Sequence, residues 1–276
     1  MVLLSVPFEP HQVRRPPAFW LPGLLTGAAA LAIIAICLAI ETLPDARLRA
    51  IAGGVAGAAV HAGFLAMGWI AAVGRTPTWK GLVARLAGVL LLASVASRFT
   101  AWGALVYLLP PILVLREGGQ DTALRAMGVT LPADRTSIAV GLGAGTFLGV
   151  HLLISASQTF GYSIRMASVS HYLAVAAYDI GANALTAEWL FRGALFSRWW
   201  RRWEFWPAAA ASTALAVGRY LLDPALPPAL EVRAGALFYM VLLGVSACAL
   251  RARTGSLLPG YLATAAFFLT YRMLAQ

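Results

Sequence analysis

Ionisable side chains inside long apolar stretches are this chain's candidates for chemistry, because a charge at membrane depth is costly and is usually functional. The residues of this kind are His61, His151, Asp179, Glu188, Arg192 and Arg219, with His171 near the end of such a stretch and Asn183 as a buried amide. Glu188 and Arg192 stand four residues apart, so they share a face of a helix and can pair. Two interpretations follow: a structural ion pair, or a carboxylate that serves chemistry while the arginine holds it.

His61 and His151 are expected to be packing residues rather than ligands. A metal site needs about three protein ligands on facing helices. His61, His151 and Asp179 supply them only if their segments converge, and the sequence does not favour this. Cys37 and Cys248 both lie within apolar segments, which argues against a disulfide framework and against a zinc site built on cysteine. We therefore expect no cofactor and no metal site.

The elements that position these residues are predicted to be membrane helices. The chain is 60% hydrophobic and only 12% charged, whereas a soluble domain is about 25% charged. This composition predicts an all-α, polytopic helical bundle with eight or nine transmembrane helices. The expected spans are 19–40, 50–74, 82–97, 100–115, 137–160, 170–196, 205–222, 234–250 and 255–271. The third and fourth meet at Ser97 and Arg98, where they form either two spans or one broken hairpin.

The basic residues predict the orientation of the bundle. Nine spans with a cytoplasmic N-terminus place most arginines and lysines in cytoplasmic loops, as the positive-inside rule requires. We expect a multi-pass protein of a bacterial inner membrane. The net charge of +10 is then explained by loops that face anionic lipid, so membrane lipid is an expected partner and nucleic acid is not.

Three stretches resemble the motifs of one family. The sequence AEWLFRGALF at 187–196 is similar to the E-E-x-x-F-R-G-x-L motif of the CPBP family, the CAAX-protease and bacteriocin-processing (Abi-type) intramembrane proteases. The stretches 212–221 and 253–268 resemble the family's second and last motifs, and 125–130 is also family-like. The resemblance predicts a CPBP-like core at 125–276, preceded by about four membrane helices within 1–124.

The resemblance implies an active site in which two histidines, an asparagine and the first glutamate activate water, through a metal or with the glutamate as base. In this chain those positions hold Ala187, Tyr220, Thr264 and Phe268, while the supporting pair Glu188 and Arg192 is retained. Alanine and phenylalanine bind neither a proton nor a metal. A shift of the second motif by one residue brings in Arg219 or Leu221, and no histidine follows His171.

The resemblance and the lost positions together predict a catalytically inactive member of the family. Such a protein binds, sorts or helps to process membrane-anchored or prenylated-type peptides, and an active protease paralogue is a possible partner. One alternative is an active intramembrane protease with non-standard chemistry centred on Glu188, for which zinc would be the cofactor. A second alternative is a small-molecule transporter, which is less favoured because the sequence shows no internal repeat.

Overall fold

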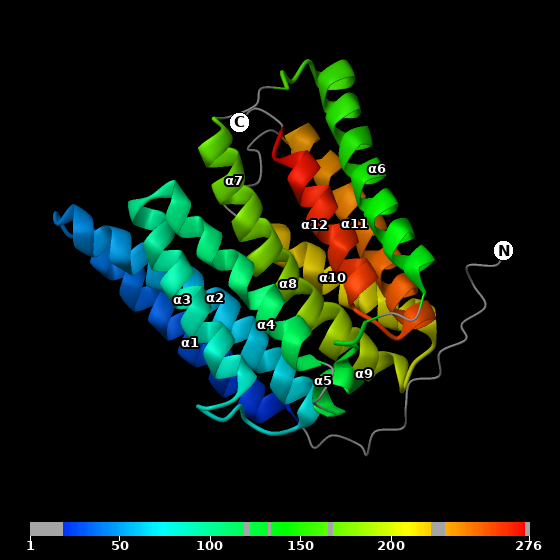
Figure 1. Cartoon of the computed structure of the whole chain (residues 1–276), viewed down its shortest axis with the longest axis horizontal. Coiled ribbons are helices and arrows are strands. Elements are labelled where there is room, and N and C mark those ends of the chain that lie inside the picture. The colour runs from blue at the N-terminus through cyan, green and yellow to red at the C-terminus, as the bar shows by residue number, and fades with distance from the viewer. Residues whose placement is uncertain (1–18, 119–121, 132–133, 165–167, 222–229, 274–276) are drawn as a thin grey trace.

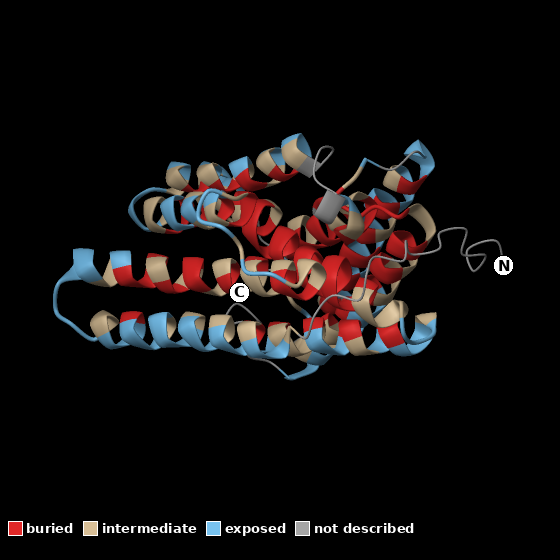
Figure 2. Ribbon diagram, turned by 90° about the horizontal axis from the view of Figure 1, so that it is seen from below, coloured by how far each residue is buried: buried red, intermediate tan, exposed pale blue. Residues whose placement is uncertain are grey.

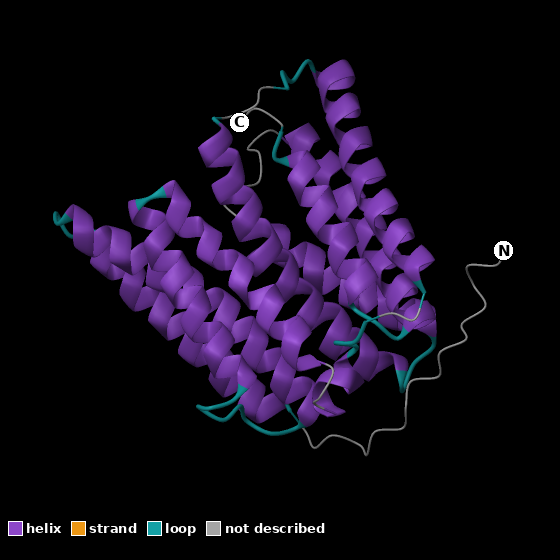
Figure 3. Cartoon of the chain, viewed as in Figure 1, coloured by secondary structure: helices purple, strands orange, loops and turns teal. Residues whose placement is uncertain are grey.

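The described part of the protein is almost entirely helical. The computed structural model describes residues 19–118, 122–131, 134–164, 168–221 and 230–273, and these ranges contain no β-strand (Figures 1 and 3). The prediction of an all-α bundle is confirmed for this part of the chain. The last residue of the predicted span 205–222 lies outside the described residues.

The N-terminal group of elements comprises α1 (Trp20–Glu41), α2 (Ala46–Val73), α3 (Leu82–Phe99), the 3-10 helix η2 (Ala101–Leu108), α4 (Leu109–Gly118) and α5 (Thr122–Met127). A long, almost straight helix follows as α6 (Arg135–Phe160). The site-bearing helix consists of α7 (Val169–Tyr178), η3 (Asp179–Ala184), α8 (Leu185–Ala187), η4 (Glu188–Phe196) and α9 (Ser197–Trp200). The chain ends with α10 (Phe205–Leu221), α11 (Leu230–Thr254) and α12 (Leu258–Tyr271).

Five helices are individually long and apolar enough to cross a membrane. They are α1, α2, α3, the part of α6 up to Thr159, and the part of α11 from Arg233. The chain is therefore a multi-pass membrane protein. The other predicted spans are short, as in α10 and α12, or are divided by changes of helix type. The count of eight or nine spans stays a prediction.

The break between the third and fourth predicted spans falls at Thr100, two residues later than expected. Thr100 has extended backbone dihedrals (φ −154°, ψ 143°), and its hydroxyl accepts a hydrogen bond from the Trp102 N–H. This cap begins a new helical element at the residue where the fourth predicted span, 100–115, starts. Ser97 and Arg98 lie inside α3, and α3 and η2 form a tight helical hairpin.

Glycines fix the packing of α6 against α12. Gly141 and Gly145 face the carbonyl oxygens of Pro259 and Ala263 so closely that a Cβ at either position would clash. A Cβ at Gly149, one further turn along, would lie 3.1 Å from the Phe267 carbonyl oxygen. Small residues repeated every four positions let two membrane helices approach at their backbones. On another side, α12 contacts η3 of the site-bearing helix.

The helix from α7 to α9 runs through the centre of the molecule (Figure 1). Buried residues concentrate around it, whereas α1 is largely exposed (Figure 2). Asp179–Ala184 and Glu188–Phe196 are π-helical. Such wide turns are rare and frequently occur at functional sites. Gly181 lies in the first π-helical stretch, against the Tyr107 carbonyl oxygen of η2, where no side chain fits.

Candidate functional site

The Glu188 carboxylate is held by one residue of its own helix and one of α12. Its Oε1 accepts a hydrogen bond from the Thr264 hydroxyl at 2.8 Å. The Arg192 Nη1 lies 3.6 Å from the same oxygen, and the two side chains are only 3% and 5% exposed. At 3.6 Å the contact is electrostatic rather than a hydrogen bond. The first and last family-like motifs therefore meet at Glu188.

The second carboxylate oxygen of Glu188 has different surroundings. Glu188 Oε2 is buried and has no hydrogen-bond partner among the described residues. It faces Gly260 of α12, where a Cβ would lie 3.2 Å from the oxygen. Buried polar atoms nearly always form a hydrogen bond with protein or water, so this oxygen is an exception among buried acceptors.

The Arg192 side chain crosses to α10 and α11. Its Nη2 lies against Gly244, where a Cβ would be 2.7 Å from the nitrogen and 2.7 Å from the Thr213 methyl group. Gly244 thus leaves the space in which the guanidinium group fits. Sequence reasoning singled out neither Gly244 nor Thr213, although Thr213 lies in the second family-like stretch, because their contact with Arg192 depends on how three helices pack.

Aromatic rings occupy two of the positions that hold reactive groups in the family. The rings of Tyr220 and Phe268 are 5.4 Å apart and tilted, and both residues are buried. The Arg219 guanidinium lies 4.6 Å from the centre of the Tyr220 ring. Ala187 is fully buried and adds no polar atom from its side chain. At the four positions where the resemblance implies two imidazoles, an amide and a carboxylate, this chain has two aromatic rings, a hydroxyl and a methyl group.

Comparison with known families agrees with the motifs. Residues 169–269 match the family model described as type II CAAX prenyl endopeptidase Rce1-like. This region resembles the Rce1-like family. The predicted resemblance to the CPBP proteases is confirmed here, over a shorter range than the predicted core of 125–276. No curated protein and no solved structure matches the chain significantly.

A second polar cluster surrounds Asp179 and Asn183, which precede Glu188 on the site-bearing helix. Arg272 donates to both carboxylate oxygens of Asp179, from Nε at 2.8 Å and from Nη2 at 3.2 Å. Asn183 donates to Asp179 at 2.9 Å and accepts from Arg219. The sequence singled out three of these residues but missed Arg272, which follows the last apolar segment. The sequence does contain a signal for this pair: Arg272 directly follows a predicted span, and Asp179 is an acidic residue inside another span.

The histidines are not brought together. His61 is buried between Thr186 and Tyr178, with Nδ1 at 2.9 Å and Nε2 at 3.1 Å from their hydroxyl oxygens. His151 is exposed and bonds Tyr239, and His171 is exposed at the start of α7. Among the residues that the structure describes, no three His, Cys, Asp or Glu side chains could share a metal ion.

The motif positions do not fit a zinc ion, the cofactor that the active-protease alternative would need. Of the side chains at the motif positions, Glu188 alone offers a carboxylate, and Arg192 places a positive charge beside it. Thr264 supplies a hydroxyl that already donates to Glu188. Zinc requires imidazole, thiolate or carboxylate ligands, usually three or four. We derive no metal-dependent step for this site.

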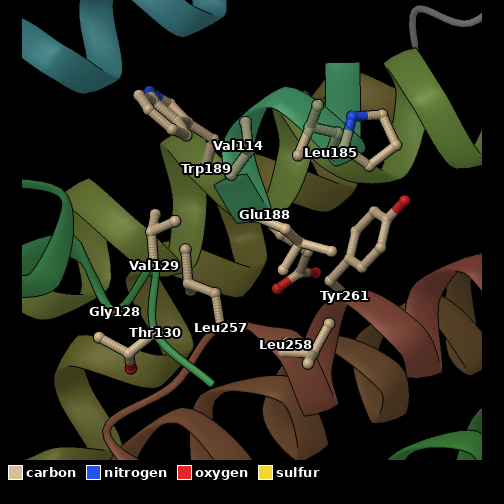
Figure 4. A pocket seen from close by; sticks show the side chains of 12 residues that line it. Val114, Gly128, Val129, Thr130, Leu185, Glu188, Trp189, Leu257, Leu258 and Tyr261 are labelled. Carbon is tan, nitrogen blue, oxygen red and sulfur yellow. The ribbon is translucent and has the colours of Figure 1, made fainter. Parts of the chain in front are cut away.

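An apolar pocket adjoins Glu188 (Figure 4). Its walls come from α4, from the turn at 128–130, from the site-bearing helix and from the start of α12. The lining residues are Pro111, Val114, Leu115, Gly128, Val129, Thr130, Leu185, Glu188, Trp189, Leu257, Leu258 and Tyr261. Figure 4 shows the Glu188 carboxylate between Leu257, Leu258 and Tyr261. Sequence reasoning did not find this pocket, because its walls are far apart in the chain.

Proposed function

We propose that the chain is a catalytically inactive relative of the intramembrane CAAX-type proteases, which binds membrane-anchored peptides, including prenylated ones, without cleaving them. The proposal is carried by the contacts of Glu188, the retained carboxylate, and by the loss of the reactive groups expected around it. Glu188 is engaged by Thr264 and Arg192, while an aromatic pair and an alanine stand at three of the positions expected to hold reactive groups.

Peptide hydrolysis needs a group that activates water beside the scissile carbonyl. Enzymes use a general base within hydrogen-bond reach, or a metal ion that makes hydroxide available near neutral pH. No imidazole replaces the lost ones among the described residues: His61 is held by Thr186 and Tyr178, and His151 by Tyr239. The remaining groups at the site are better suited to bind a peptide than to hydrolyse it.

The proposed setting is a bacterial inner membrane with the N-terminus in the cytoplasm. Basic side chains cluster at the end of the molecule that carries the turns 74–81 and 201–204, where anionic lipid would meet them. Membrane lipid and an active protease paralogue are the proposed partners, together with the peptide. Nucleic acid is not among them.

A photo-crosslinking residue at Leu258 in the pocket tests this function. The full-length protein is reconstituted with a defined panel of membrane-anchored peptides, irradiated and analysed by mass spectrometry. We expect crosslinks to peptides with both ends intact. The control carries the same crosslinker at Leu142, an exposed position of α6. Equal crosslinking at the two positions, or crosslinks to truncated peptides alone, would contradict the proposal.

One observation favours the alternative of an active protease. The buried Glu188 Oε2 has no hydrogen-bond partner among the described residues, and an unengaged carboxylate oxygen is what a general base requires. This alternative predicts cleavage of a membrane peptide that disappears in Glu188→Gln. Stoichiometric zinc in the purified protein, lost on substitution of His61 or His151, would also support it.

A further inference from the structure

Arg219 of α10 differs from the other arginines around the site-bearing helix in the group that binds it. Arg192 and Arg272 each face a carboxylate oxygen, at 3.6 Å and 2.8 Å. Arg219 has no carboxylate partner in the described part of the chain, and its hydrogen bond goes to the side-chain oxygen of Asn183, a neutral amide. Arg219 is therefore oriented by its partner without being neutralised.

The amide that orients Arg219 is itself held in place. The Asn183 nitrogen donates to Asp179 at 2.9 Å, and Asp179 accepts two hydrogen bonds from Arg272. Asp179 and Asn183 are both 0% exposed. Arg272 balances the charge of Asp179, so the four side chains together carry one net positive charge. An uncompensated charge of this kind is unfavourable in a low-dielectric environment.

The Arg219 guanidinium has unused hydrogen-bond donors. It carries five N–H donors, and the described residues accept one hydrogen bond from it. It lies 4.6 Å from the centre of the Tyr220 ring and 5.7 Å from that of Phe64, and such rings compensate a cation only in part. Arg219 is partly exposed, so a ligand can reach it. An anion would supply both the acceptors and the missing negative charge.

The polar cluster lies near the face of the membrane opposite to the turn 201–204. Asn183 precedes Arg201 by 18 residues along the site-bearing helix, which corresponds to roughly 27 Å at the α-helical rise. The hydrocarbon core of a bilayer is about 30 Å thick. Figure 1 shows the start of α7 and the end of α12 at the end of the molecule away from α9. With the turn 201–204 at one face, Arg219 lies at the level of the lipid head groups of the other.

We propose that Arg219 binds the head group of a lipid that carries a single negative charge, a phosphodiester, at the membrane face opposite to the turn 201–204. One negative charge balances the net charge of the cluster, and the phosphate oxygens accept the unused N–H groups. This is one defined contact, unlike the general attraction of basic loops for anionic lipid at the other face. The inference goes beyond the proposed function, because it involves neither Glu188 nor the apolar pocket.

Two photoreactive lipids test the proposal with purified full-length protein in phosphatidylcholine nanodiscs. One is phosphatidylglycerol with a diazirine near the start of an acyl chain, and the other is its methylated, uncharged phosphotriester. We expect the charged lipid to label residues of α10 or α2 near Arg219 with roughly ten-fold or greater preference over the phosphotriester. Unlabelled phosphatidylglycerol should compete, whereas inorganic phosphate and a soluble peptide with a free C-terminal carboxylate should not.

Three variants sharpen the test. Arg219→Gln removes the charge and should make the two lipids label equally. Asn183→Asp keeps the arginine but places a carboxylate beside it, so the cluster loses its net charge and the preference should disappear as well. Arg47→Gln, at an exposed position in the first turn of α2, is the matched control and should retain the preference. If Arg219→Gln does not fold, Asn183→Asp and the unmodified protein still decide.

Several results would overturn the inference. Equal labelling by the two lipids in the unmodified protein, or a preference that persists in Arg219→Gln, would mean that Arg219 does not bind the head group. Competition by inorganic phosphate as strong as that by phosphatidylglycerol would mean that the site takes a soluble anion. Competition by the peptide alone would assign the site to a peptide. None of these results depends on whether the protein cleaves peptides, so the inference and the proposed inactivity can fail separately.

Discussion

The Glu188–Arg192 pair should behave as one energetic unit, and a double-mutant cycle measures this. The single variants are Glu188→Gln and Arg192→Met, and the double variant carries both. The two side chains are 3% and 5% exposed and lie 3.6 Å apart. Removing one partner of a buried pair costs about 3–5 kcal/mol, because the other charge stays buried without compensation.

The long distance favours the lower end of this range, so each single variant should lose about 3 kcal/mol of unfolding free energy. Gln at 188 can still accept the Thr264 hydrogen bond, so that contact adds little. The double variant leaves neither charge buried, so it should lose less than either single variant, about 0–1 kcal/mol rather than the sum of about 6 kcal/mol.

Unfolding by SDS in mixed micelles, followed by tryptophan fluorescence, provides the assay, since the chain has 9 tryptophans. Single variants that each lose less than about 0.5 kcal/mol, or a double variant whose loss equals the sum, would refute the reasoning. The first result would mean that the pair is hydrated in the membrane, and the second that the two charges do not interact.

Three further predictions concern packing and capping. Gly145→Ala forces a methyl group against the α12 backbone and should cost about 1–3 kcal/mol in the same unfolding assay, whereas Gly143→Ala, with nothing within 4 Å of its Cβ, should be neutral or slightly stabilising. Trp189→Phe removes a 3.0 Å hydrogen bond from the indole nitrogen to a backbone carbonyl of α2, and a loss of about 1–3 kcal/mol is expected; no loss would show that the carbonyl is otherwise satisfied. Hydrogen bonds from the Thr136 N–H and the neighbouring hydroxyls lower the pKa of Asp134 at the start of α6, so its small stabilising effect should be complete above its ordinary pKa range and lost as the pH falls through the lowered value. Unfolding midpoints at about pH 6 and about pH 3 should therefore differ more in the unmodified protein than in Asp134→Asn, and equal differences would contradict the cap.

The sequence was sufficient for the local features of the site. Glu188 and Arg192 were predicted to share a helix face from their spacing, and the structure places them in contact. His61 was expected to be a packing residue, and it bonds two hydroxyl groups on the neighbouring helix. These features depend on spacing and on the cost of burying a polar group, both of which can be read from one sequence.

The features that needed the structure depend on packing between distant segments. The two π-helical stretches flanking α8 follow no pattern of apolar residues. They occur where Gly181 meets the backbone of η2 and where Gly260 and Gly244 give room to Glu188 and Arg192. The contact between Thr264 and Glu188 joins residues 76 positions apart. No local propensity predicts such contacts, because they depend on which helices become neighbours.

The most direct test of the account is a cleavage measurement on the purified full-length protein. Membrane-anchored and prenylated peptides are incubated with the protein in nanodiscs, with and without added zinc, and the products are identified by mass spectrometry beside an active type II CAAX peptidase. The account predicts no cleavage above the level of Glu188→Gln under either condition. Peptide products that form with the unmodified protein and disappear in Glu188→Gln would contradict it.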